Sequence, residues 1–182
     1  IVLLKRKSHS KIVQEIAPHQ NTIGVMLPYT PLHYLLLEPQ PDFPYALVMT
    51  SGNLSEEPIA IHNQQAKQQL RHLADGFLLH NREIYTRCDD SVVQVMRDKK
   101  YFIRRSRGYA PLSITLPFSV KEILAGGGEL KNTFCLTKGN QAFQSQHIGN
   151  LENYETFQAF EEAIYSFEQL FRITPQLSLI HI

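Results

Sequence analysis

The first hundred residues alternate short apolar runs with polar, proline-rich stretches. Apolar runs of this length that end at turn residues predict strands. These strands are expected at 1–4, 22–27, 45–49, 76–80, 91–96 and 101–104. Helices are expected between them at 8–16, at 32–37 and from Asn63 onward. Strands and helices that interleave in this way predict an α/β fold.

Two of the expected helices carry start signals. Thr30 and Pro31 place a hydroxyl at the N-cap and a proline at the first helical position. Asn63 is expected to cap the next helix, because the apolar residues that follow it recur at helical spacing. These signals fix where the helices begin more firmly than where they end.

The pattern changes at about 111–119, where prolines and small residues indicate a linker. The block that follows opens with an apolar run at 123–125 and a run of three glycines. A hairpin is predicted from strands at 134–136 and 142–144 around the turn Lys138–Gln141. Asn153 is expected to cap a last helix, whose core-facing stripe is Phe157, Phe160, Ile164, Phe167 and Phe171.

Composition narrows the class of protein. The chain has 182 residues, 43% of them hydrophobic and 19% charged, as in an ordinary globular protein. A net charge of +1 gives no general attraction to nucleic acid or anionic membranes. Cys88 and Cys135 have no metal-binding spacing and suit a reducing cytosol, so a cytoplasmic location is expected. Both ends stop within a strand-like pattern, at Ile1 and at Leu177–Ile182, so we interpret the chain as a fragment.

The segment Thr50–Asn53 is the first candidate for chemistry. It follows a predicted strand, and loops at strand ends of open α/β sheets are common ligand sites. Its hydroxyls and amide suit phosphates or a nucleotide, and Gly52 allows close approach of the backbone. Serine, glycine and asparagine are also ordinary turn residues, so the spacing alone leaves both interpretations open.

Charged residues offer weaker candidates. Arg104, Arg105 and Arg107 match a phosphate clamp, since guanidinium groups pair with phosphate oxygens, or a solvated strand end. Asp89 and Asp90 are candidate Mg²⁺ ligands, although such a pair is more often a turn or a cap. Cys88 has no base placed near it by the sequence, which disfavours a nucleophile.

The glycine-rich turn Gly126–Gly128 lacks the spacing of the known phosphate-binding fingerprints. Its amides are nonetheless suited to surround an anion, with Lys131 and Asn132 adding a charge and an amide. His147 stands alone in the sequence, which is typical of a packing or hydrogen-bonding residue. Taken together, the residues predict an α/β protein that handles nucleotides or phosphate, without naming the reaction.

Several strings, in order and across nearly the whole chain, resemble the family of hydrogenase maturation carbamoyltransferases, HypF. These strings lie at 21–33, 49–59, 78–82, 87–93, 104–111 and 127–133. The resemblance implies that residues 1–117 are the later part of a YrdC-like domain, a twisted mixed sheet with helices. Residues 118–182 would begin a carbamoyltransferase domain similar to actin-like ATPases.

The family's activity follows as an expectation. The YrdC-like domain joins carbamate, made from carbamoyl phosphate, to ATP with Mg, which gives carbamoyl-adenylate and pyrophosphate. The next domain transfers the carbamoyl group to the C-terminal cysteine of the protein HypE, where it becomes a cyanide ligand of NiFe hydrogenase. Zinc and a transferase-site metal are expected only in parts of the family outside this chain. No membrane partner is expected, and nucleic acid is disfavoured although the family carries a double-stranded RNA-binding label.

Site residues carry over only where the strings match. Thr50, Ser51 and Asn53 are expected to contact the phosphate or the acyl-adenylate. The resemblance places Ser91 near the nucleotide and a phosphate-binding arginine at Arg104 or Arg105. Lys131 and Asn132 are candidates for holding carbamoyl-adenylate during transfer. No catalytic residue is assigned with certainty.

Three departures and two rivals complete the prediction. The YrdC lysine-x-arginine motif would precede Ile1, the metal-ligand histidines and aspartate would follow Ile182, and Leu177–Ile182 does not resemble the family. We therefore hypothesise that the chain alone is inactive. The rivals are a threonylcarbamoyl-adenylate synthase of tRNA modification, which the block after Gly127 disfavours, and a non-catalytic RNA-binding module built on Arg104, Arg105 and Arg107.

Overall fold

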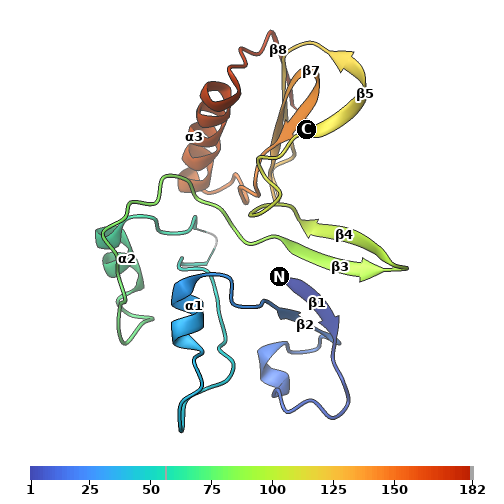
Figure 1. Cartoon of the computed structure of the whole chain (residues 1–182). Coiled ribbons are helices and arrows are strands. Elements are labelled where there is room, and N and C mark those ends of the chain that lie inside the picture. The colour runs from blue at the N-terminus through green and yellow to red at the C-terminus, as the bar shows by residue number, and fades with distance from the viewer. Residues whose placement is uncertain (56, 181–182) are drawn as a thin grey trace. The chain divides into compact units, whose positions relative to one another are not determined.

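A computed structural model describes residues 1–55 and 57–180 of the chain (Figure 1). The described chain forms two compact units. The first comprises 1–50 with 92–103, and the second comprises 51–91 with the residues from Arg104 onward. Each unit contains one four-stranded sheet, so the predicted α/β class with a mixed sheet is confirmed.

The first unit is built on the sheet β2-β1-β3-β4. Its strands are β1 (Val2–Lys5), β2 (Thr22–Val25), β3 (Val92–Met96) and β4 (Lys99–Arg104). Strand β1 runs antiparallel to β2 and parallel to β3, which makes the sheet mixed. The predicted pair of strands around 97–100 is confirmed, although the turn lies at Arg97 and Asp98, both at positive φ.

One of the two helices predicted in the first unit forms as expected. Helix α1 (Pro31–Leu36) begins after Thr30, whose hydroxyl accepts a hydrogen bond from the His33 N–H at 3.2 Å. The helix predicted at 8–16 is wrong, because only a short 3₁₀ turn, η1 (Gln14–Ile16), is present there. The Ser10 hydroxyl accepts from the Ile12 N–H at 3.3 Å, and such local bonds compete with helix formation.

The strands predicted at 45–49 and 76–80 are also wrong. Neither segment forms a strand in the described structure, and Tyr45 and Ala46 lie in a bend. Tyr45 and Val48 are 85% and 71% exposed, so the apolar run is not buried. Apolar composition makes a strand only where a neighbouring strand completes the hydrogen bonds.

The second unit is built on the sheet β5-β7-β6-β8. Its strands are β5 (Ile114–Val120), β6 (Ile123–Gly126), β7 (Phe134–Gln144) and β8 (Leu177–Ile180). Strand β6 pairs antiparallel with β7 and parallel with β8.

Strand β5 occupies most of the stretch predicted as a linker. Ile114 and Thr115 pair with Ala142 and Gln141 of β7, and the register then shifts before Val120. Proline lacks an N–H and is tolerated in sheets at such irregularities, which accommodates Pro117. The linker interpretation was wrong because prolines and small residues do not exclude an edge strand.

The two ends of β7 lie side by side. The Ser145 N–H donates to the Phe134 carbonyl at 2.8 Å, although a straight strand of this length would separate them by roughly 35 Å. The chain therefore reverses within β7, and Gly139 at φ +59° marks the turn. This reversal is the hairpin predicted around Lys138–Gln141.

Helix α3 (Tyr154–Phe171) lies along this sheet (Figure 1). The Asn153 side chain caps it as predicted, accepting from the N–H groups of Glu155 and Thr156. The core of the second unit joins α3 to β7 and consists of Phe134, Leu136, Ala163, Phe167 and Ile173. The predicted stripe contributes to it, except that Phe157 is 41% exposed.

Helix α2 (Asn63–Leu70) begins one residue earlier than predicted. His62 is its N-cap, so Asn63 is the first helical residue and not the cap. The Asn63 side chain donates instead to the His80 carbonyl at 2.7 Å. Within the described residues, no helix combines the length and apolarity that crossing a membrane requires.

Candidate functional site

The loop after Ser51 is held by its own hydrogen bonds. The Asn53 amide donates to the carbonyls of Leu54 at 2.8 Å and Glu57 at 3.0 Å. The Ala60 N–H closes the loop on the Gly52 carbonyl at 3.0 Å. The Asn53 side chain therefore stabilises the loop. Its buried Oδ1 has no hydrogen-bond partner within the described residues. Thr50 belongs to the first unit, whereas Ser51 and Asn53 belong to the second.

Ser91 is placed against the arginine-rich segment. It is buried, and its hydroxyl accepts from the Ser106 N–H at 2.8 Å and donates to the Arg107 carbonyl at 2.9 Å. Ser106 is fully buried beside it. Ser91 thus binds the backbone of the arginine-rich segment at Ser106 and Arg107, and its contact with nucleotide stays a prediction.

Arg104 is held by a carboxylate that the sequence suggested for magnesium. Arg104 NH1 lies 3.7 Å from Asp89 Oδ2, and the same oxygen accepts from His147 Nδ1 at 2.8 Å. Asp89 and His147 are both mostly buried, whereas Arg104 is 38% exposed at its side chain. Arg104 therefore keeps open donors for a ligand, while Asp89 fixes its position.

Arg105 is committed to the backbone. Its guanidinium donates to the carbonyls of Tyr109 and Leu112, both at 2.9 Å, and of Gln144 at 3.3 Å. Burial lowers the pKa of Arg105, although a cysteine nearby acts in the opposite direction. Of the two arginines predicted for phosphate binding, Arg104 is thus the one whose guanidinium group makes fewer hydrogen bonds within the protein.

Arg107 completes the set. Its Nε donates to Asp90 Oδ1 at 3.1 Å and its NH2 donates to the Cys88 carbonyl at 2.7 Å. The two aspartates proposed for Mg²⁺ are thus paired with cationic or imidazole groups and do not fit a magnesium site as they stand. Over residues 1–55 and 57–180, no cluster of three His, Cys, Asp or Glu side chains is placed to hold a metal. The hydrogen bonds of Arg105 and Arg107 leave these two arginines less available as an RNA-binding patch.

The glycine-rich turn is closed by Asn132. This residue is 2% exposed, and its amide donates to the carbonyls of Gly127 at 3.0 Å and Gly128 at 2.8 Å. Its neighbour Lys131 is exposed at φ +52°, and its N–H donates to Asn150 Oδ1 at 2.9 Å. Both carbamoyl-transfer candidates thus lie on the turn between β6 and β7, and their transfer role stays a prediction.

The sequence did not predict the side-chain pairs that join residues 87–89 to His147 and to α3. Asp89 and His147 stand 58 positions apart, and Arg87 pairs with Glu162 of α3 at 3.1 Å. No local spacing connects such residues. The prediction that His147 is a hydrogen-bonding residue is nevertheless confirmed.

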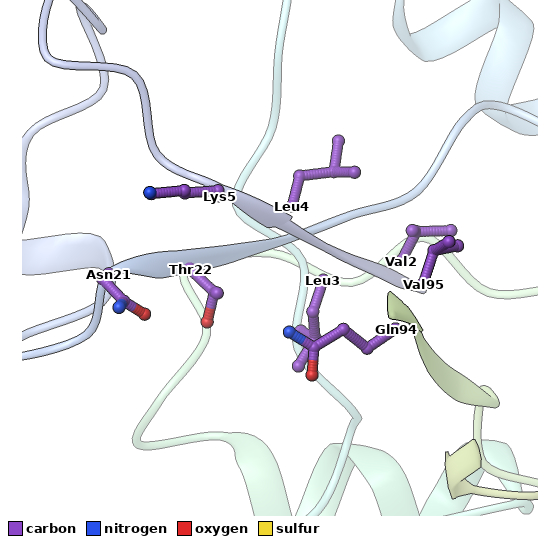
Figure 2. Close-up of a pocket in the computed structure, with 8 residues that line it drawn as sticks. All are labelled: Val2, Leu3, Leu4, Lys5, Asn21, Thr22, Gln94 and Val95. Atoms are coloured by element: carbon purple, nitrogen blue, oxygen red, sulfur yellow. The ribbon is translucent and has the colours of Figure 1, made fainter. Parts of the chain in front are cut away.

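A separate pocket of about 380 Å³ lies on the first unit. It is lined by residues of β1, β2 and β3 and by Asn21 (Figure 2). Leu3, Thr22 and Gln94 extend to one side of the sheet there, and Lys5 supplies the charge (Figure 2). None of the predicted site residues lines this pocket.

Two family models match successive parts of the chain. Residues 1–106 match the Sua5/YciO/YrdC family, described as telomere recombination. Residues 119–181 match the HypF Kae1-like domain. The prediction that the segment from Leu177 does not resemble the family is therefore wrong, because the match continues to residue 181. The boundary predicted at 117 stays a prediction.

Curated relatives cover nearly all of this chain. It is 50% identical over 177 residues to the carbamoyltransferase HypF of Synechocystis sp., and 44% identical over 191 residues to the carbamoyltransferase HypF2 of Cupriavidus necator. Each alignment covers 97% of this chain, and the chain spans 23% and 24% of those relatives. It thus spans about a quarter of their length.

Solved structures agree. A crystal structure of full-length HypF in a phosphate- and nucleotide-bound form superimposes with a TM-score of 0.92 at 49% identity, over 99% of this chain and 28% of that one. The structure of T. kodakarensis HypF gives 0.85 at 40% identity, over 93% and 22%. Fold and site thus define a YrdC-like α/β segment followed by a Kae1-like one. The chain belongs to the HypF family.

Proposed function

We propose that this chain is the part of a carbamoyltransferase that contributes to carbamoyl-adenylate formation and to carbamoyl transfer. The observation that carries the proposal is the continuous match to relatives named carbamoyltransferase HypF, across both the YrdC-like and the Kae1-like segments. The substrates are ATP, with Mg, and carbamate derived from carbamoyl phosphate.

The first step is adenylation. A carbamate oxygen attacks the α-phosphorus of ATP, the bond to the bridging oxygen breaks, and pyrophosphate leaves. Positioning the two reactants and neutralising the developing charge supply the rate, so no covalent enzyme intermediate is needed. Arg104, fixed by Asp89, is suited to neutralise phosphate charge, and Thr50, Ser51 and Ser91 are the hydroxyls assigned to the ligand.

The second step is transfer to HypE. The thiolate of its C-terminal cysteine attacks the carbamoyl carbon, the carbon–oxygen bond to AMP breaks, and AMP leaves. The turn of Gly127 and Gly128 is suited to hold the anionic part of the adenylate through backbone N–H groups, and Lys131 is exposed beside it.

The test uses a chimeric HypF, in which this chain replaces the matching segment of the Synechocystis relative. With ATP, Mg, carbamoyl phosphate and HypE, mass spectrometry of the C-terminal HypE peptide should show one carbamoyl group on its cysteine. An unmodified HypE peptide with the chimera, alongside a modified one with the parent enzyme, would contradict the proposal.

A second candidate is a threonylcarbamoyl-adenylate synthase, because the Sua5/YciO/YrdC match alone suits it. The Kae1-like match over 119–181 favours the carbamoyltransferase. Replacing carbamoyl phosphate by threonine and bicarbonate in an adenylation assay separates the two activities.

A further inference from the structure

Asn132 is the polar side chain most tightly built into the glycine-rich turn. Its backbone N–H donates to the Gly149 carbonyl at 2.7 Å, and its carbonyl accepts from the Ile148 N–H at 2.9 Å. Its amide group donates to two consecutive carbonyls, those of Gly127 and Gly128. Backbone and side chain of one residue thus bind both sides of the turn.

These bonds use every donor that the amide possesses. An asparagine side chain has two N–H hydrogens, and both are directed to backbone carbonyls. The two acceptors also fix the orientation of the amide, since a flipped group would place Oδ1 against them. Asn132 Oδ1 is buried and accepts no hydrogen bond from the described residues. The amide thus has no hydrogen left to donate to a ligand.

The same bonds set the direction of two N–H groups. In a planar trans peptide the C=O and N–H point in opposite directions. Because the carbonyls of Gly127 and Gly128 face Asn132, the N–H groups of Gly128 and Glu129 face away from it. Two successive N–H groups on one side of a turn form an anion-binding concavity.

The glycines around this turn differ in the space they have. A Cβ on Gly127 would lie 2.7 Å from the Thr133 carbonyl oxygen, and the Gly127 N–H already donates to that oxygen at 2.8 Å. A Cβ on Gly128 would meet nothing within 4 Å. The turn is therefore packed at Gly127 and open at Gly128. The N–H groups of Gly128 and Glu129 donate to no group within the described residues.

We propose that Asn132 is a positioning residue for carbamoyl transfer. It holds two peptide groups so that the N–H groups of Gly128 and Glu129 meet an anionic oxygen of the adenylate, and its own side chain does not touch that ligand. This inference rests on the proposed function and replaces the direct ligand contact expected for Asn132 from sequence.

The test measures two activities of the chimeric HypF with Asn132→Ala and Asn132→Asp. ATP–pyrophosphate exchange, the first step, should stay within about twofold of the unsubstituted chimera. Carbamoylation of HypE should fall by about a hundredfold or more in both variants, the order of the loss of one preorganised donor to developing negative charge. Asn140→Ala, at an exposed asparagine of the β7 turn, is the matched control and should change neither activity.

Each alternative gives a different result. If Asn132 Oδ1 bound the ligand as an acceptor, Asn132→Asp would retain transfer, and the proposal would be overturned. If Asn132 served only general folding, exchange and transfer would fall together. If the unsubstituted chimera lacked both activities, the proposed function would fail instead.

A second variant reaches the same turn without altering Asn132. Gly127→Ala displaces the turn through its clash with the Thr133 carbonyl and should also reduce transfer selectively. The double variant Asn132→Ala with Gly127→Ala should carbamoylate HypE no more slowly than the less active of the two single variants, because both substitutions act through one turn. Losses that multiply would indicate an independent ligand contact and contradict the positioning role.

Discussion

Asp89 accepts a hydrogen bond from His147 at 2.8 Å, which joins the YrdC-like match to the Kae1-like match through two side chains. The same carboxylate lies 3.7 Å from Arg104. A residue of the second segment thus helps to fix an arginine assigned to the first reaction step. This contact connects the YrdC-like segment to the Kae1-like segment within the second unit.

A double-mutant cycle measures that link. Asp89→Ala and His147→Ala should each destabilise the chain, with a coupling free energy of about 1 kcal/mol, because removing either residue takes a hydrogen bond from the other, mostly buried, polar group. Urea unfolding followed by circular dichroism gives the values. The more exposed pair Asp90 and Arg107 is the control and should couple by about 0.5 kcal/mol or less. Equal coupling in both cycles would contradict the special role of the Asp89 contact.

The two neighbouring arginines should separate stability from activity. Arg105→Lys should lower the free energy of unfolding by about 2 kcal/mol, because the compact ammonium group of a lysine cannot reach the three separate carbonyls that the planar guanidinium group spans. Arg104→Lys should change it by about 0.5 kcal/mol or less and reduce ATP–pyrophosphate exchange in the chimera. Stability that fell equally in both variants would contradict this division of roles.

Helix caps, a hairpin and ion pairs show what the sequence could and could not predict. The Thr30 and Asn153 caps and the β7 hairpin were predictable, because each depends on residues within a few positions. The ion pairs of Asp89 and Arg87 were not, since their partners are brought close only by the fold. The apolar run at 45–49 was predicted as a strand but forms none, because no neighbouring strand pairs with it in the described structure.

Cys135 should react slowly with alkylating reagents. Burial raises the pKa of its thiol, against a backbone hydrogen bond from Phe143 and the charge of Arg105, so less thiolate is present at neutral pH. In a Cys88→Ser background, iodoacetamide labelling should be slower in the folded chain than in urea and should accelerate as the pH rises. Equal rates in the two states across that pH range would contradict the burial effect.

The two glycines of the turn should differ in stability. Gly127→Ala places a methyl group 2.7 Å from a backbone oxygen. This overpacking should lower the free energy of unfolding by about 1–3 kcal/mol, and the melting temperature should fall with it. Gly128→Ala meets open space and should leave the melting temperature near that of the unsubstituted chain. The reverse order would show that the turn is not packed at Gly127.

The central claim is that this chain supplies part of an adenylating carbamoyltransferase, and donor-dependent ATP–pyrophosphate exchange tests it most directly. The chimeric HypF should exchange pyrophosphate with carbamoyl phosphate and not with threonine plus bicarbonate, and the 182-residue chain alone should show no exchange. Exchange that required threonine, or exchange by the isolated chain, would contradict the account.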